Sequence, residues 1–372
     1  MKNLLGLAHL DVSALAKRLV RQAGRAIRFA FAGALLYGAL GASTTVATAA
    51  EVQDASAPAK PGYIALLLPG QAKAFKSAVD NIRAGVLAGE RVHGGTDAVP
   101  LRVFDTTDKE EDIQQQFKAA VEGGALAVIG PLTKSALNFL ADSTELKVPV
   151  VALNNFDQTT LPQAQLFSFG LGVEADAAGV AQLVQSEGLR QPLILLSNDP
   201  IALRQAQGFA ATWKEQTGSE PVMVTMGNPK RDASQLKTQL AETSADAVFL
   251  AMDAKSARMV RPFIGNEIPV YATSQIYPAR LGASAMVDLA GVKYLEMPWL
   301  ANPDQDGYDL YIRNRSNSND LERLFALGVD AWQVAAILAK GGKVEQLDGL
   351  TGVLNIGRDN VVTRQMVVRT LH

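Results

Sequence analysis

The chain has 372 residues, of which 48% are hydrophobic and none is cysteine. This composition suits one large or two medium-sized domains with apolar cores, and it excludes disulfides, thiol catalysis and sulfur-ligated metals. Charge is nearly balanced, with 35 basic and 37 acidic residues. Six of the basic residues and one acidic residue lie in the first fifty, so the rest carries 29 basic against 36 acidic side chains. This acidic body argues against nucleic acid or an anionic membrane surface as the main partner.

Residues 1–50 have the pattern of a secretory signal peptide. A basic stretch ends at Arg28, and the apolar segment 29–40 that follows is too short to span a bilayer. Small residues up to Ala49 and Ala50 predict cleavage there, while an uncleaved anchor is the alternative. The small, polar, Pro-containing residues 51–61 are expected to be a linker. Since no cysteine is available to carry a lipid, we expect a soluble periplasmic protein without a stable membrane anchor after signal removal.

From Tyr63 onward, short apolar runs alternate with amphipathic helical segments. In the first half, the runs predict strands at 63–70, 101–106, 126–131, 148–155 and 166–172. A helix is expected where Phe75, Val79, Ile82 and Val86 recur at helical spacing, and another after the acidic residues 108–112, which match a helix N-terminus. A third helix is expected over 134–144.

The second half repeats the pattern. Strands are predicted at 192–196, 221–226, 247–251 and 270–273, and helices at 174–187, 203–217, 232–243 and 255–264. A long helix is predicted over 320–340, with its apolar residues on one stripe. The C-terminal tail alternates in polarity and turns at 357–360, which predicts a hairpin.

This order predicts an α/β protein made of two doubly wound parallel-sheet lobes with an interlobe cleft. The runs lack polar alternation, which is typical of parallel strands that helices cover on both faces. We place the chain crossings near Ser168, Thr273 and Asp348. Lobe 1 is then expected to comprise 62–168 plus 274–348, and lobe 2 to comprise 169–273 plus 349–372.

The sequence offers little for catalysis. Of the three histidines, His9 lies in the signal and His372 is the last residue, so only His93 remains, in a turn-rich connection where we expect a solvated loop side chain. We therefore predict no catalytic residues and no metal site. The chain has no GxGxxG after a strand and no GxxxxGK[ST], so no cofactor is expected.

Polar residues at the carboxyl ends of the strands are the candidates for a small-molecule site, because ligands of open parallel sheets bind there. The candidates from the first series are Gln71, Thr133, Ser135, Asn154 and Asn155, and those from the second are Asp199, Asp253 and Ser274. A purely structural interpretation stays open, with Thr133 and Ser135 as helix caps and the Asn pair as turn residues.

Four aromatic residues lie in a segment rich in Pro, Gly and Asp: Tyr294, Trp299, Tyr308 and Tyr311. Exposed aromatic residues in loops can anchor a partner protein. The alternative, equally open from the sequence, is that they fix the loop onto its lobe.

The order of lobes resembles that of the type I periplasmic binding proteins, and several strings narrow the resemblance. "VIGPLTKSALNFL", "VPVVALNN", "FSFGLGVEADA", "VYATSQ", "GVKYLEMPWL" and above all "RLFALGVDAWQVA" followed by "LDGLTGVL" resemble the LppC/LpoA family of penicillin-binding protein activators. The resemblance covers the chain from Tyr63 to its end. Gly328, Val329, Asp330, Ala331 and Trp332 match the family string, and we interpret them as determinants of the fold.

The resemblance implies a non-enzymatic periplasmic regulator that binds a class A penicillin-binding protein and promotes peptidoglycan synthesis. Two features depart from the family: the chain lacks the lipidated cysteine, and only a short linker precedes Tyr63 where better-known members carry a helical-repeat domain. The alternative is a solute-binding protein of an importer for amino acids or similar small polar ligands. In that case Thr133 and Ser135 would serve the ligand carboxylate, and Asp199 or Asp253 its ammonium group.

Overall fold

The computed structural model describes residues 62–157, 160–311 and 315–372. The expected signal peptide, its cleavage site at Ala49 and Ala50, and the expected linker lie outside the described residues. The described residues form one compact unit, built around two sheets of mainly parallel strands. The predicted α/β fold is therefore confirmed.

The first sheet has five parallel strands in the order β2-β1-β3-β4-β5. Its strands are β1 (Tyr63–Leu68), β2 (Leu101–Asp105), β3 (Ala125–Ile129), β4 (Val150–Ala152) and β5 (Leu166–Ser168). The short helix η1 (Lys73–Phe75) follows β1. All six residues of β1 are buried, as expected for a central strand with helices on both faces.

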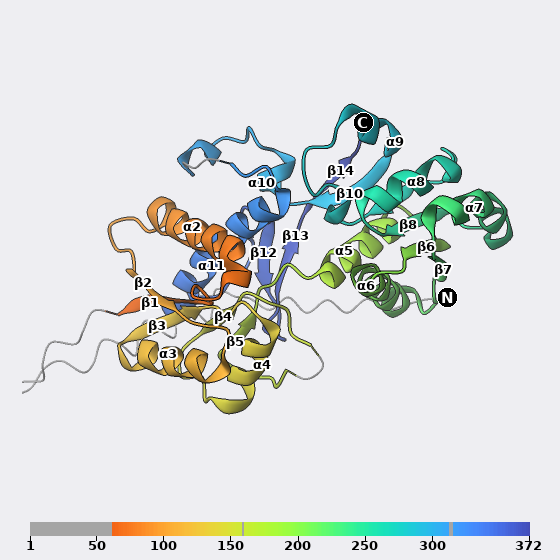
Figure 1. Cartoon of the computed structure of the whole chain (residues 1–372). Helices are drawn as coiled ribbons and strands as arrows, with labels where there is room; N and C mark the ends of the chain where they lie inside the picture. Colours follow the sequence, from red (N-terminus) through yellow and green to blue (C-terminus); the bar gives the residue numbers. More distant parts are fainter. Residues whose placement is uncertain (1–61, 158–159, 312–314) are drawn as a thin grey trace, which may run out of the picture. The chain divides into compact units, whose positions relative to one another are not determined.

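Helices cover both faces of this sheet, and alternate residues of β1 contact different helices. Ile64 and Leu66 pack in one cluster with α2 (Lys76–His93) and α11 (Asn319–Ala339), whereas Ala65 and Leu67 pack with α3 (Glu110–Glu122) and α4 (Lys134–Ser143). Figure 1 shows α2 and α11 running alongside each other. The acidic first turn of α3 confirms the helix start predicted there.

Glycines set the spacing between α2 and α11. A Cβ on Gly85 would lie 2.1 Å from the carbonyl oxygen of Phe325, and one on Gly328 would lie 2.3 Å from that of Ile82. Both obstacles are backbone atoms, which cannot rotate away as a side chain can. The two helices therefore approach at a distance that only glycine permits, and the family string "FALG" has this packing role.

The second sheet has six strands in the order β14-β10-β9-β8-β6-β7. They are β6 (Pro192–Ser197), β7 (Val222–Met226), β8 (Ala247–Ala251), β9 (Val270–Ala272), β10 (Val292–Glu296) and β14 (Val367–Thr370). All pairs are parallel except β10 with β14. On one face Ile194 packs with α5 (Val173–Ser186) and α6 (Pro200–Thr217); on the other, Leu195 packs with α7 (Pro229–Thr243) and α8 (Ala254–Ile264).

A third, antiparallel sheet connects α11 with β14. It contains β11 (Leu347–Asp348), β12 (Val353–Ile356) and β13 (Val362–Gln365), in that order. The β12–β13 pair confirms the predicted hairpin. The remaining short elements are η2 (Ser274–Ile276), α9 (Ala283–Asp288), α10 (Pro298–Ala301) and η3 (Tyr308–Leu310).

The predicted lobe boundaries need two corrections. Residues 274–348 were assigned to the first lobe, but β10 pairs with β9 of the second sheet, so the second crossing follows Glu296 rather than Thr273. Residues 349–372 were assigned to the second lobe, but Leu354 and Val362 pack in the core of the first, and only β14 joins the second sheet. The chain leaves the first sheet after β5, which ends at Ser168, and β6 belongs to the second sheet.

Helix starts also differ from the predicted ones. The helix expected from Asp232 begins at Pro229 instead, with Asn228 as its N-cap.

His93, expected in a solvated loop, is the last residue of α2; its ring is exposed, and its Nε2 lies 2.6 Å from the Tyr311 hydroxyl. His93 is only partly buried, and this partial burial lowers the pKa of its imidazole, which favours the neutral form.

Candidate functional site

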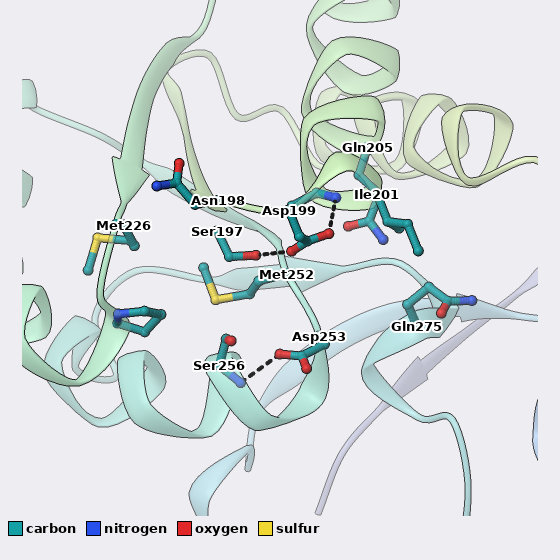
Figure 2. A pocket seen from close by; sticks show the side chains of 13 residues that line it. Ser197, Asn198, Asp199, Ile201, Gln205, Met226, Met252, Asp253, Ser256 and Gln275 are labelled. Atoms are coloured by element: carbon teal, nitrogen blue, oxygen red, sulfur yellow. Dashed lines mark hydrogen bonds between the residues drawn. The ribbon is translucent and has the colours of Figure 1, made fainter.

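A pocket of about 460 Å³ lies at the carboxyl ends of β6, β7 and β8. The order β7-β6-β8 makes this the place where the second sheet reverses its direction of winding, and open parallel sheets bind ligands at such points. Figure 2 shows Ser197 and Asp199 on one wall, Asp253 and Ser256 on another, Met252 between them and Met226 at the left side. The equivalent point of the first sheet, beside Thr133 and Pro131, holds a cavity of only about 10 Å³, roughly the volume of one water probe.

Two predicted residues, Asp199 and Asp253, line this pocket, and both also cap helices. Asp199 accepts from the backbone N–H of Ala202 at 2.9 Å and from the Ser197 hydroxyl, and Asp253 accepts from the N–H of Ser256 at 2.8 Å. Burial opposes the ionisation of Asp199, but its hydrogen bonds from Ser197 and Ala202 outweigh burial and lower the pKa of this carboxyl. Asp199 therefore carries a negative charge in the pocket at neutral pH.

The third predicted residue of the second series, Ser274, faces a buried ionic network instead. Its hydroxyl donates to Asp176 at 3.0 Å, and its carbonyl oxygen accepts from Arg323 at 3.1 Å. Arg323 also pairs with Glu296 at 2.6 Å, and both side chains are about 95% buried or more. Burial raises the pKa of Glu296 in spite of the guanidinium beside it. This network ties α11 to β10 and η2, so Ser274 has a structural role.

The five candidates from the first series make hydrogen bonds within their own sheet. Thr133 is the N-cap of α4, accepting from the N–H of Ala136 at 3.3 Å, and its hydroxyl lies 3.3 Å from that of Ser135. Asn154 donates to the carbonyl of Leu132 at 2.8 Å, and Gln71 donates to that of Asp105 at 3.0 Å. The capping interpretation is therefore confirmed for Thr133, whereas a ligand role for the other residues of this series stays a prediction.

Asn155 packs against the segment that leaves the first sheet. A Cβ on Gly172 would lie 1.8 Å from the Asn155 Nδ2, and one on Gly170 would lie 2.4 Å from its Oδ1. The glycines of "FSFGLG" are needed because the Asn155 amide occupies the space beside them. Asn155 is thus placed at the first crossing, and a ligand role for it stays a prediction.

The pocket contains a residue that sequence reasoning missed. Gln205 lies on α6, is 1% exposed, and its Oε1 has no hydrogen-bond partner. It belongs to the helix face that also buries Ala202, Ala206, Phe209 and Trp213. An amide on an otherwise apolar helix face was the available signal, since buried polar groups are ordinarily paired.

The aromatic segment is fixed onto the first lobe. Trp299, Tyr308 and Tyr311 are 91% buried or more and pack with Phe325 of α11. The Trp299 Nε1 donates to Glu322 at 2.9 Å. Tyr294 is a buried residue of β10. Of the two interpretations of these side chains, the structural one holds.

The strings "FALGVDAW" and "LDGLTG" are joined by one buried carboxylate. Asp330 is fully buried on α11 and accepts from the N–H groups of Leu350 and Thr351, each at 2.8 Å, and from the Thr351 hydroxyl at 2.6 Å. Gly349 must be small because a Cβ there would lie 2.5 Å from this carboxylate. The interpretation of the string as a determinant of the fold therefore has a physical basis.

Two sheets of parallel strands, each covered by helices and linked by three chain crossings, define a protein of the type I periplasmic-binding-protein class. The family model described as LppC putative lipoprotein matches residues 45–369, and the chain belongs to this family. The resemblance inferred from the sequence is confirmed.

The named relatives of this chain agree with the family assignment. A penicillin-binding protein activator LpoA from Pectobacterium parmentieri is 24% identical over 319 residues, covering 73% of this chain and 47% of that protein. One from Edwardsiella ictaluri is 25% identical over 368 residues, covering 87% and 52%. The chain thus spans about half the length of the curated relatives it matches.

Solved structures share the fold. The C-domain of LpoA from Haemophilus influenzae, described as a regulator of PBP1A, matches with a TM-score of 0.72 at 22% identity, covering 84% of this chain and 98% of that domain. A putative branched-chain amino acid ABC transporter protein from Chromobacterium violaceum also matches with a TM-score of 0.72, at 30% identity, covering 83% and 99%. None of the helices in the described ranges is long and apolar enough to cross a membrane.

Proposed function

We propose that the protein is a periplasmic, non-enzymatic activator that binds a class A penicillin-binding protein and promotes peptidoglycan synthesis. The observation that carries the proposal is the match to the LpoA C-domain: nearly all of that regulatory domain aligns with residues of this chain. The family match over residues 45–369 supports the same assignment.

The side chains of the candidate site support a role without catalysis. Thr133, Asp199 and Asp253 are engaged in capping helices, and Ser274 belongs to a buried network. The exposed ring of His93 contacts Tyr311, and His93 is distant along the chain from every strand-end candidate. A nucleophile and a base within hydrogen-bonding reach of each other would be needed for acyl transfer, and these contacts serve structure instead. The basic and apolar N-terminal pattern supports export to the periplasm.

Co-purification tests the proposal. The full chain would be expressed with its signal in its own host, recovered from the periplasm, and passed over an immobilised class A penicillin-binding protein from that host. We expect saturable binding to this enzyme and none to a class B enzyme, which serves as the matched control. Equal retention by both columns, or by neither, would contradict the proposal.

A second candidate function is that of a solute-binding protein for an amino acid. It is favoured by the neighbour from Chromobacterium violaceum, whose whole length this chain matches, and by the pocket at the switch point of the second sheet. Such a site would take the ligand carboxylate at Thr133 and Ser135. A thermal-shift screen of amino acids tests it: a shift of several degrees that Ser135→Ala removes, together with no binding to the synthase, would favour this function.

A further inference from the structure

The strand-end pocket of the second sheet has an unsatisfied acceptor in its wall. The Gln205 side chain is 99% buried, and its amide oxygen has no partner. Figure 2 shows this amide turned into the pocket, toward the carboxylate of Asp199. Asp199 already accepts from Ser197 and Ala202 and is itself an acceptor, so it cannot satisfy the Gln205 oxygen, and a donor in the pocket is required. A buried acceptor left unpaired is unfavourable, and a ligand with N–H groups would pair with it.

The charges of the pocket select a cation. Of its thirteen lining residues, all within the described ranges, two are acidic and none is Lys, Arg or His. Three helices, α6, α7 and α8, begin beside it, and helix N-termini ordinarily attract anions. Here each of these helices has an N-terminal N–H bonded to its own cap, Asp199, Asn228 or Asp253. The capping carboxylates therefore offset the helix dipoles and leave negative charge facing the cavity.

Part of the remaining wall is apolar and suits a short hydrocarbon chain. Met226 and Met252 are 1% and 2% exposed, and Ile201 at the rim is 50% exposed. Methionine side chains adapt to ligands of varied shape. A volume of about 460 Å³ lies within the range of small-molecule sites.

We propose that this pocket binds a small primary ammonium compound with an aliphatic chain, using residues of the second lobe alone. The ammonium group donates to the Gln205 amide oxygen and to the Asp199 carboxylate beside it, and Asp253 on the other wall adds negative charge. The hydrocarbon part lies against the two methionines. A diamine or a diamino acid has this chemistry. The inference does not depend on the proposed activator function, and it differs from an amino-acid site shared by two lobes because it needs no carboxylate on the ligand.

Calorimetric titration of the periplasmic full-chain protein tests the proposal with matched ligands. Diaminobutane and lysine carry the ammonium group, butanediol has the same length without charge, and glutarate carries only carboxylates. We expect diaminobutane and lysine to bind with a Kd of about 1 mM or tighter, and the two controls not to bind. Binding of lysine without diaminobutane, or binding of neither, would overturn the proposal.

Three variants locate the site. Asp253→Asn removes a charge yet retains a good N-cap, and Gln205→Leu removes the amide at similar volume. Each should weaken diaminobutane binding at least about 10-fold, equivalent to 1.4 kcal/mol. Asp246→Asn is the control: this carboxylate accepts from the backbone N–H groups of Arg190 and Gln191 at the amino ends of β8 and β6, opposite to the strand ends that form the pocket, so affinity should not change. Unchanged affinity in the first two variants would refute the site.

The stability of Gln205→Leu separates a ligand site from a structural amide. If the buried Oε1 is unpaired without ligand, replacing it by an apolar group leaves the Tm of the free protein unchanged or raises it. A Tm lowered by several degrees would show that the amide is bonded within the free protein, and the proposal would fall. Ser135→Ala should leave diaminobutane binding unchanged, whereas a loss would assign the ligand to both lobes.

Discussion

The Asp330→Ala variant tests the role of the buried carboxylate that joins the two family strings. The substitution leaves the N–H groups of Leu350 and Thr351 and the Thr351 hydroxyl without their acceptor, and both residues are at least 96% buried. Each unsatisfied buried donor costs roughly 1–3 kcal/mol, and partial relaxation makes the total smaller than three times that value. We expect a loss of about 3–5 kcal/mol, in the range measured when a buried charge network is broken.

A loss of this size is readily measured. For a protein of this length it corresponds to a Tm lowered by roughly 6–12 °C, with the denaturant midpoint falling in parallel. Thr351→Val is the matched control, because it removes one of the three donors at constant shape and should cost about 1–2 kcal/mol. Hydrogen exchange should accelerate first around β11 and β12. If Asp330→Ala melts within about 2 °C of the parent protein, the carboxylate does not secure this segment and the reasoning is refuted.

Three further predictions concern Asp330, the close contact of α2 with α11, and the buried Arg323–Glu296 pair. Burial raises the pKa of Asp330 from 3.8 to about 6, so its stabilising contribution is complete below pH 3.8 and is lost as the pH rises through about 6. The free energy of unfolding in urea should therefore be roughly 2–3 kcal/mol larger at pH 4 than at pH 7, and Asp330→Asn should lack this difference. The same difference in the variant would contradict the prediction. Gly85→Ala should destabilise the protein by about 1–3 kcal/mol because its Cβ would meet the Phe325 carbonyl. Gly179→Ala is the control and should be nearly neutral, because its Cβ would meet only the flexible end of Leu295. Equal melting temperatures of the two variants would disprove the close packing of α2 and α11. Arg323→Met should lower the free energy of unfolding by about 3–5 kcal/mol, because it leaves Glu296 buried without its partner. Adding Glu296→Gln should recover part of this loss in a double-mutant cycle. Additive effects of the two substitutions would count against the pair.

Much of the fold could be predicted because its signals are local. The runs of β1, β6 and β8 are apolar throughout, as strands covered on both faces must be, and the helix starts at Thr133 and Asp253 follow capping preferences. The strand β10 was not predicted because its apolar run ends in Glu296, and glutamate is ordinarily a surface residue. It is buried only because Arg323, 27 residues later, pairs with it. No local pattern contains that information.

The candidate site was predictable in part for the same reason. Asp199 and Asp253 were found because polar residues directly follow buried strands, and the structure brings both to one pocket. Ser274 directly follows a strand in the same way, yet its partner Asp176 lies 98 residues earlier in the chain, so its structural role could not be deduced. Gln205 was missed because a single amide within a helix has no sequence signature until its neighbours are known to leave it unpaired.

The most direct test of the central claim is a rate. A class A penicillin-binding protein would be supplied with its lipid-linked disaccharide peptide precursor, and glycan polymerisation and peptide cross-linking would be followed with increasing amounts of this protein. The account predicts that one or both rates rise to a plateau at a stoichiometric ratio, and that the protein alone converts no precursor. Rates that stay flat, or turnover of the precursor by the protein itself, would contradict it.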